Sequence, residues 1–347
     1  MSLAVELAER RWVPDSLIRH QVRRLLRGRL RDEANARRSD GADAAWLREM
    51  RSAPIALATD EANEQHYEVP AEFYRRVLGP HLKYSSALFD DGVTELGKAE
   101  HAMLALTARR ARLADGQRIL ELGCGWGSLT LFMARAFPNA EIVAVSNSRS
   151  QKRWIDEQAR EAGLTNVRVV TADINTFTTE ARFDRVVSVE MFEHVRNWEA
   201  LLARVHAWLV PEGLVFLHFF AHRAFAYPFE ATGKDDWMGQ HFFTGGMMPV
   251  KDLPERLHIP FDVVERWEVP GEHYSRTAEQ WLANLDRQAT ELVELFAKGE
   301  PRKDAERRLQ RWRIFFISCA ELFGYAHGRE WLVSHTLLAP RAGGDGR

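Results

Sequence analysis

The sequence contains few cysteines and no long hydrophobic run, and both absences narrow what the protein can be. Only two of its 347 residues are cysteine, Cys124 and Cys319, so no disulfide framework is implied and a reducing compartment fits. No stretch reaches the ~18 apolar residues that a membrane-spanning helix needs. The first residues carry charges where a secretory signal peptide has its apolar segment. We therefore expect a cytoplasmic protein without an integral membrane segment.

A strong excess of charge of one sign is also absent. The 47 Lys and Arg residues nearly balance the 49 Asp and Glu residues, which leaves a net charge of -2. This balance provides no general attraction to nucleic acid or to a membrane. Locally, eight arginines and one acid, Asp15, lie between Arg10 and Arg31. They indicate either a basic surface for an anionic partner or a solvated helix face paired with acids elsewhere, and we favour the second.

The residues that are present favour a globular chain with a large core, since 46% are hydrophobic and 28% are charged. From residue 118 onward, short apolar stretches alternate with segments of helical periodicity. The predicted strands are 119–122, 141–145, 167–170, 183–189 and 214–219, the last one preceded by a turn at 211–213. Continuous apolar strands separated by helices predict an α/β fold with a mainly parallel sheet covered on both faces.

The segments outside this alternation predict further elements. Residues 1–80 read as helical, and 341–347 as a disordered tail. Residues 220–256 are rich in aromatic side chains and glycine, which indicates a substrate lid, an aromatic mini-core, or both. Amphipathic helices are expected at 277–297 and 303–327, and strands at 260–269 and 331–338.

A glycine-rich segment follows the first predicted strand, with the pattern Glu121-x-Gly123-x-Gly125-x-Gly127. Such glycines let the backbone turn sharply and approach a ligand closely. A dinucleotide-binding loop has the spacing G-x-G-x-x-G and an acid about 20 residues further on. Here the glycines alternate and the acid precedes them, so we expect a different cofactor.

Polar clusters follow the other predicted strands. They are Ser146-Asn147-Ser148, Asp173-Ile174 and Glu190-Met191-Phe192-Glu193-His194. In open parallel sheets, ligands bind at the carboxyl ends of the strands. These clusters therefore predict one site at that edge of the sheet.

The last cluster is the candidate for catalysis. Glu193 and His194 lie three and four residues after Glu190, so all three would share one face of a helical turn. Clustered carboxylates can bind a cation, and a carboxylate or a histidine can accept a proton. No metal site is expected, because His218 and His222 lack a third ligand at metal spacing.

Two of these patterns resemble known motifs. The glycine segment resembles motif I of the S-adenosylmethionine methyltransferases. Residues 188–194 resemble the core motif shared by cyclopropane-fatty-acid synthases and coclaurine-type N-methyltransferases. Blocks that resemble the N-methyltransferase branch extend over about residues 12–338, and they are 14–19, 82–85, 222–227, 245–249, 312–315, 323–325 and 330–335.

The resemblance implies a Rossmann-like class I methyltransferase in residues 81–340, with residues 1–80 as a helical cap. The segments 220–256 and 277–327 would then be insertions on the substrate side. Its implied reaction is methyl transfer from S-adenosylmethionine to the nitrogen of a benzylisoquinoline-like or related small amine. The contacts to the cofactor would come from Tyr84, Ser85, Gly123, Asn147, Gln151, Asp173 and Ile174, together with Glu121, Gly125 and Gly127 of motif I.

The resemblance also implies roles for the catalytic cluster. Glu193 and His194 would accept the proton, and Glu190 would bind the amine. Ser86 stands where cyclopropane synthases have a cysteine, and Glu190 where they tend to have glycine. Both departures disfavour the main alternative, a lipid-modifying cyclopropane synthase. A second alternative is a non-catalytic cofactor-binding protein, and the sequence leaves a homodimer and peripheral membrane contact open.

Overall fold

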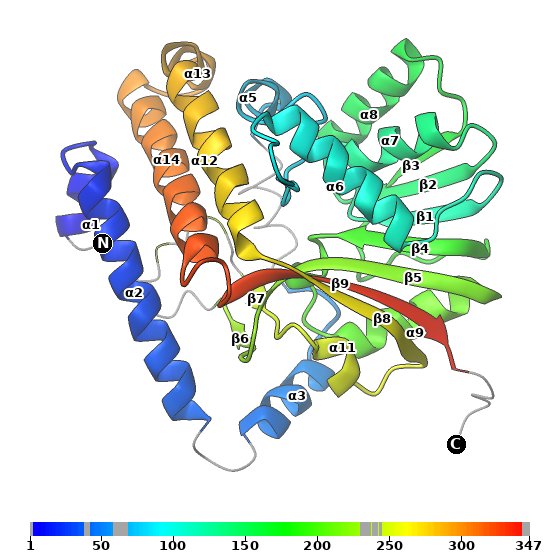
Figure 1. Cartoon of the computed structure of the whole chain (residues 1–347). Coiled ribbons are helices and arrows are strands. Elements are labelled where there is room, and N and C mark those ends of the chain that lie inside the picture. Colours follow the sequence, from blue (N-terminus) through cyan, green and yellow to red (C-terminus); the bar gives the residue numbers. More distant parts are fainter. Residues whose placement is uncertain are drawn as a thin grey trace.

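A seven-stranded sheet forms the centre of the molecule, as the computed structural model shows (Figure 1). The structure describes residues 3–37, 42–57, 69–229, 237, 242 and 245–341. The sheet order is β3-β2-β1-β4-β5-β9-β8. Its strands are β1 (Arg118–Leu122), β2 (Glu141–Ser146), β3 (Val167–Thr171), β4 (Phe183–Val189), β5 (Leu209–His222), β8 (Phe261–Val269) and β9 (Trp331–Pro340). The first five run parallel to one another, and β9 is antiparallel to both of its neighbours, β5 and β8.

Helices cover both faces of this sheet. One face carries α6 (Leu96–Arg110), α7 (Ser128–Ala136) and α8 (Arg149–Glu161), and the other carries α3 (Ala42–Ser52), α9 (Trp198–Trp208) and α11 (Leu253–Arg256). The alternation along β5 shows why both faces need cover. Val215 and Leu217 belong to the core beneath α9, whereas Phe216 belongs to the core beneath α6. Burying a side chain of this size contributes roughly 1.5–3 kcal/mol to the stability of the fold, so exposing either face of the sheet to water would be unfavourable.

A second group of helices stands beside the sheet. It contains α12 (Gly271–Arg287), α13 (Ala289–Phe296) and α14 (Arg302–Gly324), against which α5 (Ala71–Val77), α1 (Leu3–Glu9) and α2 (Asp15–Ala36) pack. The buried Arg313 joins Asp15 at the start of α2 to Asp286 of α12, at 2.8 and 2.5 Å. These ion pairs hold the N-terminal helix against the C-terminal ones.

The arginines of α2 are partly paired, in agreement with the interpretation of a solvated helix face. Arg19 contacts Glu279 at 2.5 Å and Glu321 at 3.0 Å, and Arg23 contacts Glu321 at 3.0 Å. No helix in the described part of the chain is long and apolar enough to cross a membrane.

The predicted α/β fold with its mainly parallel sheet is confirmed. The turn predicted at 211–213 is wrong, because these residues lie inside β5 as an irregularity. Leu209 already pairs with Phe183, and the register then shifts so that Leu214 pairs with Arg185. The helix predicted at 277–297 is two helices, α12 and α13, which meet at Gln288. Residues 230–236, 238–241 and 243–244 of the 220–256 segment and the tail after Arg341 lie outside the described residues.

Candidate active site

A cavity of about 1760 Å³ opens at the carboxyl ends of the parallel strands. A site for one small ligand usually measures about 300–1,000 Å³, so this cavity has room for two molecules. One wall consists of the segments that follow β1 to β4, and the opposite wall of residues from α2, α12 and α14. The sheet and the helical layer therefore form the cavity together.

The glycine segment forms part of the first wall, and two of its three glycines differ in their surroundings. All three have positive φ, at 79° for Gly123, 52° for Gly125 and 82° for Gly127. Gly125 lines the cavity, and a Cβ there would meet nothing within 4 Å. Gly127 is not among the lining residues, and a Cβ there would lie 2.6 Å from Ile155. Packing against Ile155 therefore gives a reason for glycine at this position, and the cofactor contact expected at Gly127 stays a prediction.

The buried side chain of Glu121 borders the cavity. Its Oε2 accepts a hydrogen bond from Thr130 Oγ1 at 2.5 Å. Burial is the larger effect and raises the pKa of this carboxyl to about 7. The hydrogen bond from the Thr130 hydroxyl acts in the opposite direction and makes the rise smaller. Glu121 is therefore partly protonated near neutral pH when no ligand is bound.

The other predicted cofactor residues all line the same cavity, namely Tyr84, Ser85, Gly123, Asn147, Gln151, Asp173 and Ile174. Hydrogen bonds hold several of them in place. Gln151 Oε1 accepts from Ser146 Oγ at 2.7 Å, and Asp173 Oδ1 accepts from the Asn175 amide at 2.8 Å. The structure thus brings together residues from before α6 and from the ends of β1, β2 and β3.

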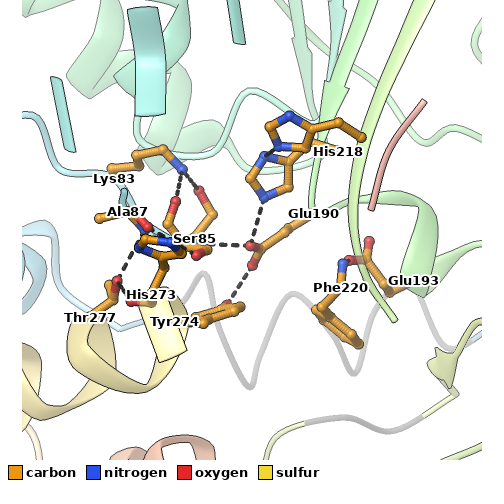
Figure 2. Close-up of polar contacts among 12 residues, drawn as sticks. Lys83, Ser85, Ala87, Glu190, Glu193, His218, Phe220, His273, Tyr274 and Thr277 are labelled. Carbon is orange, nitrogen blue, oxygen red and sulfur yellow. Dashed lines mark hydrogen bonds and ion pairs between the residues drawn. The ribbon is translucent and has the colours of Figure 1, made fainter. Parts of the chain in front are cut away.

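Glu190 lies at the centre of a hydrogen-bond network, which Figure 2 shows. Its Oε1 accepts from the Ser86 amide at 2.9 Å and is 3.1 Å from His218 Nε2. Its Oε2 accepts from the Tyr274 hydroxyl at 2.5 Å. Burial raises the pKa of Glu190 to about 6, while the nearby Lys83 ammonium and these donors oppose that rise. Glu190 is therefore held mainly as a carboxylate at neutral pH.

The expectation that Glu190, Glu193 and His194 share one helical face is wrong. Only Phe192–His194 forms a 3₁₀ turn, and Glu190 has a positive φ of 48°. Glu190 and His194 line the cavity, but Glu193 does not. Its Oε1 accepts from the Phe220 amide at 2.6 Å, and within the described part of the chain its Oε2 has no hydrogen-bond partner. Burial and the charge of Glu190 raise the pKa of Glu193 well above its usual range.

Sequence reasoning missed several residues of the site. Tyr274 comes from α12, which shows only an amphipathic pattern, and His218 was considered only as an incomplete metal ligand. Lys83 is buried, and its Nζ donates to Ser85 Oγ at 2.5 Å and to the Ser86 carbonyl at 2.7 Å. The signal available in the sequence was the presence of a lysine within the block at 82–85. Within the described residues, no group of three or more His, Cys, Asp and Glu could hold a metal ion.

The comparisons with known proteins agree with this geometry. Residues 57–328 match the family model of mycolic acid cyclopropane synthetase. The chain belongs to this family. Within the family, it is 39% identical to (S)-coclaurine N-methyltransferase of Thalictrum flavum subsp. glaucum, over 83% of this chain and 81% of the relative. The predicted resemblance and the predicted methyltransferase class are confirmed.

Two solved structures of the family extend the comparison. Coclaurine N-methyltransferase bound to N-methylheliamine and SAH superposes with a TM-score of 0.91 and 35% identity, over 97% of this chain and 98% of that one. The cyclopropane synthase MmaA2 from Mycobacterium tuberculosis has a TM-score of 0.71 at 23% identity, over 83% of this chain and 100% of that one. The second likeness shows the fold alone.

The burial of Glu121 predicts how stability depends on pH. The folded-state pKa is above that of the unfolded chain, so the folded protein keeps a proton that the unfolded chain loses as the pH rises from about 4.5 to 7. The contribution of this carboxyl to the free energy of unfolding therefore falls as the pH rises, by up to ~3 kcal/mol in total. Glu121→Gln should remove that loss, so its free energy of unfolding relative to the parent should increase between pH 5 and 8, measured by urea unfolding without ligand.

The exposed Glu212 provides the control for this measurement. Glu212→Gln removes the same charge from a solvated position, so its difference from the parent should stay constant with pH. A constant difference for Glu121→Gln as well would show that Glu121 is ionised in the folded protein.

Proposed function

We propose that the protein transfers a methyl group from S-adenosylmethionine to the nitrogen of a small amine of the benzylisoquinoline or tetrahydroisoquinoline type. The observation that carries this proposal is the meeting of two features in one cavity, the glycine-rich wall and the buried Glu190 carboxylate. The first suits a cofactor and the second suits a cationic acceptor. Coclaurine N-methyltransferase, whose solved structure holds N-methylheliamine and SAH, supports the same pair of ligands.

The residues present fit S-adenosylmethionine, which supplies a methyl group on a positively charged sulfur. Gly125 leaves open space at the cavity wall where a side chain would intrude. Trp126 Nε1 and Ser128 Oγ are buried polar atoms of the same wall, and within the described residues they have no hydrogen-bond partner. They can bind polar groups of the cofactor.

The wall beyond the glycines offers places for the rest of the cofactor. Asn147 and Gln151 follow β2 and would bind the ribose hydroxyls through their amides. Asp173 and Ile174 follow β3 and would contact the adenine. Tyr84 and Ser85 come from the segment before α6 and would close over the cofactor.

Glu190 and the aromatic residues around it suit the amine. An amine must react as the free base, since an ammonium has no lone pair. The Glu190 carboxylate would bind and orient the protonated amine on arrival. Aromatic side chains that line the cavity, Phe220, Tyr274, Trp281 and Phe323, can stabilise a cation over their ring faces.

His194 is better placed than Glu193 to take the proton. His194 lines the cavity, whereas Glu193 lies behind it, and burial raises the pKa of its carboxyl well above the usual range. We assign proton acceptance to His194, with Glu193 as a supporting group that fixes the Phe220 backbone.

Cyclopropanation of lipids remains the alternative, and one contact weakens it. The two residues at which this chain departs from the cyclopropane synthases touch each other, because the Ser86 amide donates to the Glu190 carboxylate. The carboxylate of this chain therefore lies against the backbone of Ser86, at a position where those enzymes tend to have glycine.

Methyl transfer itself can be measured with labelled S-adenosylmethionine, a panel of benzylisoquinoline and simple amines, and phospholipid vesicles with unsaturated chains. We expect the label on the nitrogen of a ring-containing amine and none in the lipid. Glu190→Gln keeps the shape of the side chain but not its charge, and should reduce transfer to the amine by at least about tenfold. Label recovered in cyclopropanated acyl chains would support the alternative function instead.

The role of His194 predicts a specific pH dependence. His194→Ala should reduce turnover by roughly 10²–10⁴-fold while leaving cofactor affinity nearly unchanged. The loss should become smaller at higher pH, because solvent then deprotonates more of the amine. His258→Ala, at an exposed position, is the control and should behave as the parent. A parental rate for His194→Ala at every pH would assign the proton to another group or to water.

A further inference from the structure

A row of side chains connects Glu190 to the end of α6. His218 of β5 and His335 of β9 are direct partners across the two antiparallel strands. His218 Nδ1 lies 2.9 Å from His335 Nε2, and His335 Nδ1 lies 2.8 Å from an Arg110 guanidinium nitrogen. Both imidazoles are at most 1% exposed. The contact between His218 Nε2 and Glu190, which Figure 2 shows, completes an unbroken chain of hydrogen bonds.

The arginine determines the direction of every bond in this chain. A guanidinium can only donate, so His335 Nδ1 must accept and the ring proton of neutral His335 is on Nε2. His335 then donates to His218 Nδ1, which places the proton of neutral His218 on Nε2. His218 must therefore donate to Glu190. Burial lowers the pKa of both histidines well below the usual range, which agrees with two neutral rings.

The other partners of Glu190 act in the same direction. The Ser86 amide can only donate, and Tyr274 donates its hydroxyl to the second oxygen. A protonated Glu190 would need an acceptor for its own proton. At Oε1, His218 can offer one only if both histidines exchange tautomers. At Oε2, the Tyr274 hydroxyl would have to accept instead of donate, and so give up the bond that it now makes to the carboxylate. Arg110 opposes the exchange of tautomers, because Nδ1 of His335 would then carry a proton toward the guanidinium.

We propose that Arg110 is a positioning residue for methyl transfer, which acts through His335 and His218 to keep Glu190 Oε1 a hydrogen-bond acceptor and thereby favours the carboxylate. The effect of Arg110 on methyl transfer rests on the proposed function, whereas its effect on the tautomers of His335 and His218 does not. An anionic Glu190 is what a cationic acceptor requires, and a neutral one would offer no charge to it. Arg110 itself does not line the cavity.

Other groups face Glu190 and also affect its charge. Lys83 stabilises the carboxylate, whereas Glu193 is a nearby acid, and the Tyr274 hydroxyl and the Cys319 thiol are buried beside it as neutral groups. Around Arg110, the neighbouring charges are Arg109 and Glu265. Replacing Arg110 changes none of these groups, so its effect on Glu190 can be separated from theirs.

The pH profile of kcat/KM for the amine is the first test. Arg110→Gln places an amide that can donate or accept, so Glu190 should keep its proton to higher pH. We expect the acidic limb of the profile to move up by about one pH unit, a loss of about tenfold on that side that is recovered at high pH. Arg110→Lys can only donate and should keep the parental limb. Arg109→Gln removes the same charge from the exposed neighbouring position and should also match the parent.

The tautomers themselves are the second test, and they do not depend on activity. Two-bond ¹⁵N–¹H correlation spectra of the parent should show the ring proton on Nε2 of both His218 and His335, assigned with His218→Gln and His335→Gln. Arg110→Gln should show a mixture. A proton on Nδ1 of either ring in the parent, or an unchanged acidic limb in a folded Arg110→Gln, would overturn the inference. If the parent shows the expected tautomers but methylates no amine, the proposed function alone would be rejected.

Discussion

The burial of the Glu190 carboxylate is the constraint on which the rest of the site depends. Removing a carboxylate from water costs several kcal/mol unless donors replace the lost hydration. Here the donors come from three separate parts of the chain, the Ser86 backbone, His218 of β5 and Tyr274 of α12. The carboxylate is therefore satisfied only when the segment before α6, the sheet and the helical layer are all in place. The site and the tertiary fold form together for this reason.

The topology of the sheet supplies the geometry that this constraint needs. β4 and β5 are neighbours, and the Glu190 amide continues their pairing by donating to the His218 carbonyl at 2.8 Å. The positive φ of Glu190 turns the chain there, so that Glu190 and His194 line the cavity while Glu193 is buried behind it. A left-handed conformation costs a glutamate roughly 1–2 kcal/mol. This cost is consistent with a backbone shaped for the site rather than for local stability.

Local patterns were sufficient to predict the strands, the glycine segment and the strand-end clusters. Each of these depends on neighbours in sequence, and parallel strands bring such clusters to one edge. The partners of Glu190 could not be predicted in this way. His218 and His335 are 117 residues apart, and their contact depends on the register between β5 and β9. A glycine pattern also does not distinguish backbone approach to a ligand from close packing, and the packing of Gly127 against Ile155 is visible only in the structure.

The central claim is that a charged Glu190 binds the amine in a cavity that also holds the cofactor. Calorimetric titration of the amine product into the protein saturated with S-adenosylhomocysteine tests this claim most directly, with Glu190→Gln beside the parent. The account predicts that Glu190→Gln binds the amine about tenfold or more weakly, while its affinity for S-adenosylhomocysteine is unchanged. Equal affinity of both proteins for the amine would contradict the account.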